Sequence, residues 1–105
     1  PVSAIAPSVS TRNATDVGTS TARLRGTVDP NGAETKYWFE YSTDSLLGAI
    51  LLKTTDQVSA GAGSNQGNVE TDISSLTPKT TYYFRIVARN SVGTVRGDRE
   101  SFKTD

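Results

Sequence analysis

Apolar and polar residues alternate with a period of two along most of this chain, and no stretch keeps the period of an amphipathic helix. Gly, Pro, Asn and Asp separate the alternating segments, and these residues favour turns. Seven segments carry the alternation or a shorter form of it, in residues 7–11, 21–28, 35–42, 49–54, 68–73, 81–89 and 94–104. Seven short strands joined by turns predict an all-β, seven-stranded antiparallel β-sandwich of the immunoglobulin-like class.

Two segments between these strands are expected to lack regular structure. Residues 13–18 predict a turn, and residues 59–67, which are small and polar, predict a flexible loop. Residues 1–6 are interpreted as the remnant of a linker, which leaves residues 7–105 as a single domain. Because the chain begins with Pro and not with Met, we expect it to be a fragment of a longer protein.

The eight aromatic residues fall in only three of the predicted strands. Four lie in residues 37–41, three in residues 82–84, and the last is Phe102. If these strands are neighbours in one sheet, that sheet supplies the aromatic half of the core. The facing sheet then supplies smaller apolar side chains, among them Leu24 and Ile73.

Composition excludes several kinds of chemistry. The chain of 105 residues has no Cys and no His, so disulfides, thiolate metal sites and imidazole-based catalysis are excluded, and no metal or cofactor is expected. Its 11 basic and 11 acidic residues balance, which argues against a nucleic-acid partner. The longest apolar run, residues 46–52, contains Gly48 and is too short to span a bilayer.

Residues 76–93 carry a pattern found near the sixth strand of a known family. Seven positions match it, namely Leu76, Pro78, Thr81, Tyr82, Ala88, Asn90 and Gly93. The chain therefore resembles fibronectin type III domains, over about residues 7–104. The resemblance implies that Tyr82 forms a tyrosine corner, with its ring in the core and its hydroxyl bonded to upstream backbone. One departure is Gly26, which lies near the place where many family members have a core Trp.

The same resemblance implies a function. Residues 26–32 are similar to bacterial members of the family that lie between catalytic, binding or anchoring modules of secreted or surface proteins. We therefore expect a non-catalytic spacer or interaction module, extracellular or at the cell surface, monomeric, with its termini at opposite ends. Its expected partners are neighbouring domains of the same chain. No catalytic site is expected, because no spacing pairs the carboxylates Glu34, Glu40, Glu70 and Asp72 across a cleft.

An alternative hypothesis is a carbohydrate- or protein-binding module. Trp38 has outward parity on its strand, and Tyr83, Arg85 and Arg89 share that face if the two strands are adjacent. Such a face could bind a polysaccharide or a surface protein. The competing interpretation is that Arg85 or Arg89 simply stacks on Trp38 as a surface cation–π pair.

A third hypothesis is adhesion through Arg96, Gly97 and Asp98, the tripeptide by which some extracellular proteins engage integrins. In fibronectin the tripeptide lies at the tip of the loop before the last strand, whereas here that tip is expected at residues 91–94. In a regular strand Arg96, Asp98 and Glu100 would also share the face of Phe102. A bulge at Gly97, or a position beyond the core, would resolve this conflict.

Overall fold

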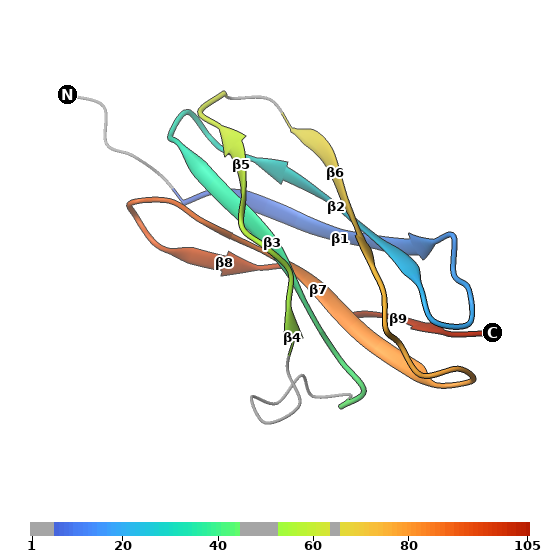
Figure 1. Ribbon diagram of the computed structural model, residues 1–105. Helices are drawn as coiled ribbons and strands as arrows, with labels where there is room; N and C mark the ends of the chain where they lie inside the picture. Colours follow the sequence, from blue (N-terminus) through green and yellow to red (C-terminus); the bar gives the residue numbers. More distant parts are fainter. Residues whose placement is uncertain (1–5, 45–52, 64–65) are drawn as a thin grey trace.

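The computed structural model describes residues 6–44, 53–63 and 66–105, which form two antiparallel sheets packed face to face (Figure 1). The smaller sheet has the order β1-β2-β6, from β1 (Ser8–Thr15), β2 (Ala22–Asp29) and β6 (Gly67–Ile73). The larger sheet has the order β4-β3-β7-β8, with β5 also pairing with β3 and β9 with β7. Its strands are β3 (Thr35–Ser42), β4 (Lys53–Thr54), β5 (Val58–Gly61), β7 (Thr81–Arg89), β8 (Thr94–Arg96) and β9 (Glu100–Lys103).

The predicted β-sandwich is confirmed, and the nine strand segments of the described residues correspond to the seven expected strands. β4 and β5 both run along one edge of β3, and β8 and β9 both run along the other edge of β7. Each pair acts as one strand with an interruption, so the sandwich has three strands in one layer and four in the other (Figure 1).

Two predicted boundaries were wrong. Residues 13–15 belong to β1 and not to a turn, because β1 continues to pair with β2 as far as Thr15 after a register shift beyond Arg12. The turn begins instead at Asp16, whose φ of 51° is left-handed. Residues 59–61 of the predicted loop belong to β5 (Val58–Gly61), because this segment pairs with the edge of β3, where backbone hydrogen bonds do not depend on side-chain size. The last residue of the predicted loop, Gly67, begins β6. Residues 49–52 of the predicted fourth strand lie outside the described residues.

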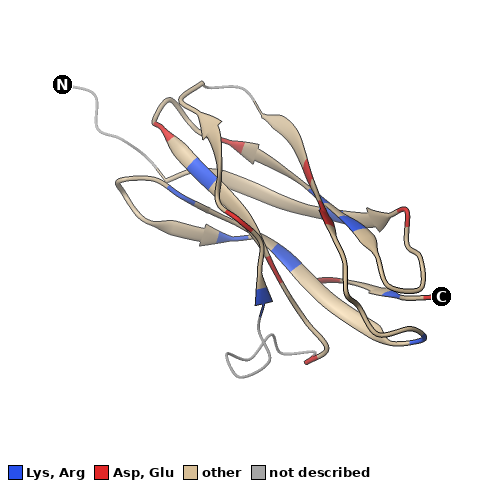
Figure 2. Cartoon of the chain, in the orientation of Figure 1, with Lys and Arg blue, Asp and Glu red and all other residues tan. Residues whose placement is uncertain are grey.

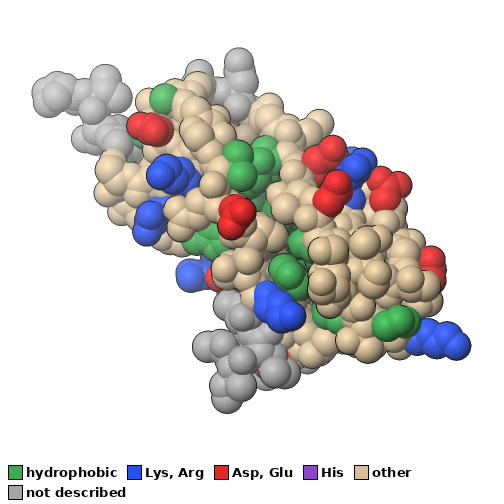
Figure 3. Space-filling view, viewed as in Figure 1, with side chains coloured by type: hydrophobic (Ala, Val, Ile, Leu, Met, Phe, Trp, Pro, Cys, Tyr) green, Lys and Arg blue, Asp and Glu red, His purple; other side chains and the backbone are tan. Residues whose placement is uncertain are grey.

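The core has the predicted division between an aromatic and an aliphatic layer. Phe39, Phe84 and Ile86 of the larger sheet are fully buried, and Phe102 packs against the rings of Tyr82 and Phe84. The smaller sheet contributes Ala22, Leu24, Val28 and Ile73. Figure 3 shows that some apolar side chains also reach the surface, along the seam between β5 and β6.

Gly26 lies where bulky residues of the two sheets meet. A Cβ at this position would come within 2.9 Å of Ile86 Cδ1 and within 2.9 Å of the Ser10 carbonyl oxygen. Ile86 therefore occupies the space next to the β2 backbone, and a large side chain cannot be placed at residue 26. This packing accounts for the absence of a core Trp on β2.

A bulge between β8 and β9 resolves the conflict of parity for Arg96, whereas Glu100, which lies after the bulge and opposite Phe84, keeps the parity of Phe102 and is half-buried. Val87 pairs with Arg96 and Phe84 pairs with Glu100, so three steps on β7 oppose four steps on the last strand. The Gly97 N–H donates to the Ile86 carbonyl at 2.8 Å within this bulge. The additional residue places Arg96 on the outer face of the sheet and Phe102 on the inner face.

Candidate functional site

The outer face of the larger sheet brings together the side chains that the sequence placed near Trp38. Cross-strand pairs join Lys36 to Arg89, Trp38 to Val87, Glu40 to Arg85 and Ser42 to Tyr83, and Val87 also pairs with Arg96 of β8. Directly paired residues point to the same side of a sheet. We call this surface the Trp38 face; it consists of Lys36, Trp38, Glu40, Tyr83, Arg85, Val87, Arg89 and Arg96. Figure 2 shows basic positions on β3, β7 and β8.

Val87 is fully buried although it points away from the core. Its cross-strand neighbours are Trp38 and Arg96, and its neighbours along β7 on this face are Arg85 and Arg89. Long arginine side chains can cover apolar surface with their methylene groups while their guanidinium groups stay in water. We attribute the burial of Val87 to these four side chains, of which Trp38 is itself half-buried.

A buried carboxylate holds two of these arginines on the Trp38 face. The Glu40 side chain is only 8% exposed, and its Oε1 accepts a hydrogen bond of 2.8 Å from Arg85 Nε. Arg96 Nε lies 3.8 Å from the same oxygen. Glu40 therefore bonds directly to Arg85 and attracts the more exposed Arg96 from a greater distance. Removing Arg85 would leave a buried carboxylate with little compensation.

The cation–π contact on this face differs from the one expected. Arg99, which lies in the segment between β8 and β9, places its Cζ 5.3 Å from the centre of the Tyr83 ring. Arg85, one of the two residues expected to stack on Trp38, instead bonds to Glu40.

At one end of the Trp38 face, Lys36 and Arg89 are directly paired and both are exposed. They line an open depression of about 530 Å³ together with Glu34, Asn90 and Ser91. In the described part of the chain, no carboxylate lies within 4 Å of either cation. Like charges directly opposite each other in a sheet are destabilising. This pair lacks the neighbouring carboxylate that neutralises Arg85.

The Arg96, Gly97 and Asp98 segment does not form a projecting loop. A Cβ on Gly97 would lie 2.5 Å from Thr11 Oγ1 and 3.0 Å from Ile86 Cγ2, so the backbone here is pressed against β1 and β7. Arg96 meanwhile lies over the sheet beside Glu40. The adhesion hypothesis needed Gly97 at an exposed loop tip, and that condition is not met.

The first described residues are held at one end of the sandwich. Asn31, at a φ of 53° in the turn after β2, donates from Nδ2 to the Ala6 carbonyl at 2.8 Å and to Ser8 Oγ at 3.2 Å. Asp29 Oδ1 in turn accepts from the Asn31 backbone N–H at 2.9 Å, and Pro7 is buried. We call this group the N-terminal anchor. The sequence identified residues 29–32 as a turn but gave no sign of the bond to Ala6.

The last residues are held at the opposite end. The Thr104 side chain is buried; its Oγ1 donates to the Thr77 carbonyl at 2.6 Å and accepts from the Thr80 N–H at 2.9 Å. The Asp105 N–H donates to the Gly18 carbonyl at 3.0 Å. We call this group the C-terminal anchor. A Thr next to the end of a strand is common, so the sequence gave no sign that Thr104 forms this anchor.

The same end contains the corner that the sequence placed at Leu76, Pro78 and Tyr82. Tyr82 Oη accepts a hydrogen bond of 2.8 Å from the Thr77 N–H, and its ring stacks on Phe102 with centroids 5.7 Å apart. Leu76 is buried and donates its N–H to the Ser20 carbonyl, whereas Pro78 is exposed. Tyr82 thus makes the bond that defines a tyrosine corner.

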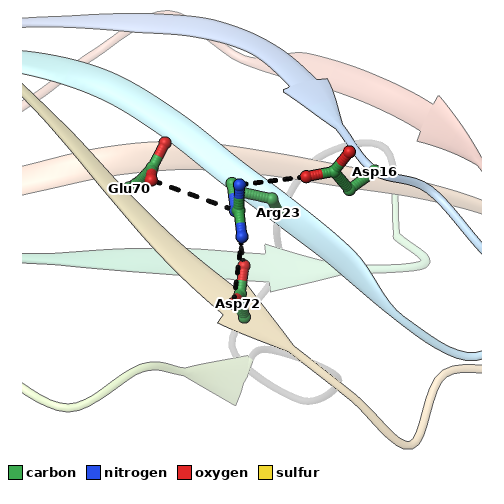
Figure 4. Close-up of polar contacts among 4 residues, drawn as sticks. All are labelled: Asp16, Arg23, Glu70 and Asp72. Atoms are coloured by element: carbon green, nitrogen blue, oxygen red, sulfur yellow. Dashed lines mark hydrogen bonds and ion pairs between the residues drawn. The ribbon is translucent and has the colours of Figure 1, made fainter.

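The smaller sheet has a separate network of charges on its outer face (Figure 4). Arg23 lies 2.8 Å from Asp72, 3.0 Å from Asp16 and 4.0 Å from Glu70. The hydrogen bond from Arg23 lowers the pKa of Asp72, and the same bond raises the pKa of the guanidinium. All four side chains are exposed to solvent, so the network adds little to stability.

No family model matches the chain, and no curated protein sequence matches it. Its fold, however, is similar to that of several solved structures. The sensor domain of the anti-sigma factor RsgI4 in Pseudobacteroides cellulosolvens superposes with a TM-score of 0.72 at 21% identity, over 97% of both chains. The fibronectin type III domain of human fibronectin type III domain containing protein 3 superposes with a TM-score of 0.65 at 18% identity, over 98% of this chain and 90% of that one. A fibronectin type III domain from the human KIAA0970 protein gives a TM-score of 0.62 at 18% identity, over 91% of this chain and 72% of that one.

These similarities establish a fibronectin type III-like β-sandwich. The described residues contain no helical segment that could span a bilayer.

Proposed function

We propose that this domain is a non-catalytic spacer in a larger secreted or cell-surface bacterial protein, where it fixes the distance and angle between neighbouring domains. The observation that carries the proposal is the pair of anchors at opposite ends of one sandwich. The fold supports it too, because neighbours of this fold include domains of larger proteins.

The two anchors lie at opposite ends of β2. Ser8, beside the N-terminal anchor, pairs with Asp29, and the Asp105 N–H at the C-terminal anchor bonds to Gly18, shortly before β2 begins. The eight residues of β2 therefore separate the anchors, at roughly 3.3 Å per residue, or about 26 Å. In Figure 1, β1 begins at one end of the sandwich and β9 finishes at the other. A pull on Ala6 or on Asp105 is therefore transmitted to hydrogen-bonded backbone.

This proposal is tested by placing the full chain between a donor and an acceptor fluorescent protein and measuring single-molecule energy transfer. A rigid spacer gives one narrow distribution that salt does not change. A Gly-Ser linker of the same length serves as the control and gives a broad distribution. Thr104→Val, which removes the side-chain bonds of the C-terminal anchor, should widen the distribution of the folded domain. A distribution for the unaltered chain as broad as that of the linker would overturn the spacer function.

A second function is favoured by one further observation. Trp38 is half-buried and accessible on an outer sheet face, next to the uncompensated pair of Lys36 and Arg89. This supports a binding module that uses the Trp38 face, with a polysaccharide or a surface protein as the partner. Because Trp38 is the only Trp, its fluorescence reports on this face alone. A saturable blue shift on adding a partner supports the binding function, and a flat response to all partners contradicts it.

A further inference from the structure

We propose that the Trp38 face binds an acidic polysaccharide, with the carboxylates of the polymer between Lys36 and Arg89 and a sugar ring against Trp38. This inference rests on the binding function proposed above and names its ligand class.

The first argument is the charge on the face. Among the described residues, Lys36, Arg85, Arg89 and Arg96 share it with Glu40, whose carboxylate already pairs with Arg85 and Arg96. The whole chain has no net charge, so this excess of positive charge is local. Glu34 lines the depression at Lys36 and Arg89 without forming an ion pair with either. A ligand carboxylate between these two cations would replace their repulsion with two attractive contacts.

The second argument is the shape of the face. Two half-buried aromatic side chains lie on this face. Trp38 is one row along the sheet from the pair of Lys36 and Arg89, whereas Tyr83 lies at the other end of the face, next to Arg99. Side chains two residues apart on a strand are separated by roughly 7 Å, which is short enough for one sugar unit to touch Trp38 while its carboxylate reaches the cations. The depression at Lys36 and Arg89 is open, and an extended polymer fits an open depression better than a compact molecule does.

The third argument is what the face lacks. A protein partner would need a well-buried apolar centre. Val87 is already covered by its neighbours, so only the half-buried rings of Trp38 and Tyr83, at separate places on the face, supply apolar area. A nucleic acid would need a strongly basic domain, and this one is neutral. Acidic sugars need only a few cations beside one flat ring.

The test uses polygalacturonate and the same polymer with its carboxylates fully methyl-esterified, each titrated against the full chain with Trp38 fluorescence as the signal. We expect saturable binding of the acidic polymer that weakens as NaCl rises from 20 to 200 mM, and at least tenfold weaker binding of the ester. Lys36→Gln/Arg89→Gln should weaken binding of the acidic polymer at least tenfold. Arg12→Gln, which removes one exposed charge from the other sheet, is the matched control and should change binding by less than twofold.

The double variant should remain folded, because it removes two exposed like charges; its melting temperature should equal or exceed that of the unaltered chain. Glu34→Gln should strengthen binding, since it removes the one carboxylate that lines the depression.

Three outcomes would overturn the inference. If the ester binds as tightly as the acid, the binding function stands but selectivity for acidic sugars does not. If single-stranded DNA binds as tightly as the acidic polymer, the face attracts polyanions in general. If no polymer changes the fluorescence of Trp38, the proposed binding function is wrong. The spacer function is tested separately, by the energy-transfer experiment.

Discussion

Replacing Gly97 with Ala tests whether the bulge between β8 and β9 is held by close packing. The added Cβ would lie 2.5 Å from Thr11 Oγ1, 3.0 Å from Ile86 Cγ2 and 3.2 Å from the Thr11 backbone nitrogen. Thr11 cannot move aside freely, because its Oγ1 accepts a hydrogen bond from the Ile86 N–H and its backbone belongs to β1. The φ of Gly97 is not left-handed, so the cost is one of space and not of backbone conformation.

The expected loss of stability follows from three effects. Overpacking of a filled site costs about 1–3 kcal/mol. Loss of the Thr11 hydrogen bond adds about 0.5–1.5 kcal/mol. Because Ala has less conformational freedom than Gly in the unfolded chain, the substitution also stabilises the folded state by about 0.4–1 kcal/mol. The net loss in the free energy of unfolding is then about 2 kcal/mol, which for a domain of this size lowers the melting temperature by roughly 8–16 °C.

Thermal and urea unfolding, followed by circular dichroism and by Trp38 fluorescence, measure this loss. Gly93→Ala is the matched control, because nothing lies within 4 Å of a Cβ placed there and its φ is also not left-handed. We expect the control to leave stability unchanged or to raise it by up to about 1 kcal/mol. A Gly97→Ala variant as stable as the control would refute the close approach of Gly97 to β1, and the tripeptide would then be less constrained than the structure indicates.

Three further predictions concern the anchors and the surface charges. Thr104→Val keeps the shape of the side chain but removes its bonds to Thr77 and Thr80, so the free energy of unfolding in urea should fall by about 1–3 kcal/mol; no change would show that water replaces those bonds. Tyr82→Phe removes the acceptor for the Thr77 N–H and should lower the melting temperature by an amount equivalent to about 0.5–1.5 kcal/mol, whereas an equal melting temperature would contradict a stabilising corner. The pKa of Asp72, followed by NMR, should lie below its usual range and return to it in Arg23→Gln; because folding lowers this pKa, its small contribution to stability is present above the unfolded value and is lost as pH falls through the folded value. An unshifted pKa in the unaltered chain would contradict the Arg23 bond.

How far the sequence predicted the candidate sites depends on the range of the contacts involved. Trp38, Tyr83, Arg85 and Arg89 could be assigned to one face from parity and the assumed adjacency of two strands. The hydrogen bond between Arg85 and Glu40 could not be predicted, because it depends on the register of β3 against β7. The anchors were missed altogether, since Asn31 and Ala6 are separated by 25 residues, and Thr104 and Thr77 by 27.

The sequence by itself determined the class of the fold and the division of its core. Alternation with a period of two forces one face of each strand inward, and the clustering of aromatic residues in three strands makes one sheet aromatic. Only the tertiary structure decided what the outward residues do. An exposed-parity position such as Val87 is buried or open depending on which side chains the neighbouring strands bring over it. Arg96 faces Glu40 only because one additional residue at Gly97 shifts the register of the last strand. Register and bulges arise from hydrogen bonds between segments distant in the sequence, so the local alternation of apolar and polar residues does not predict them.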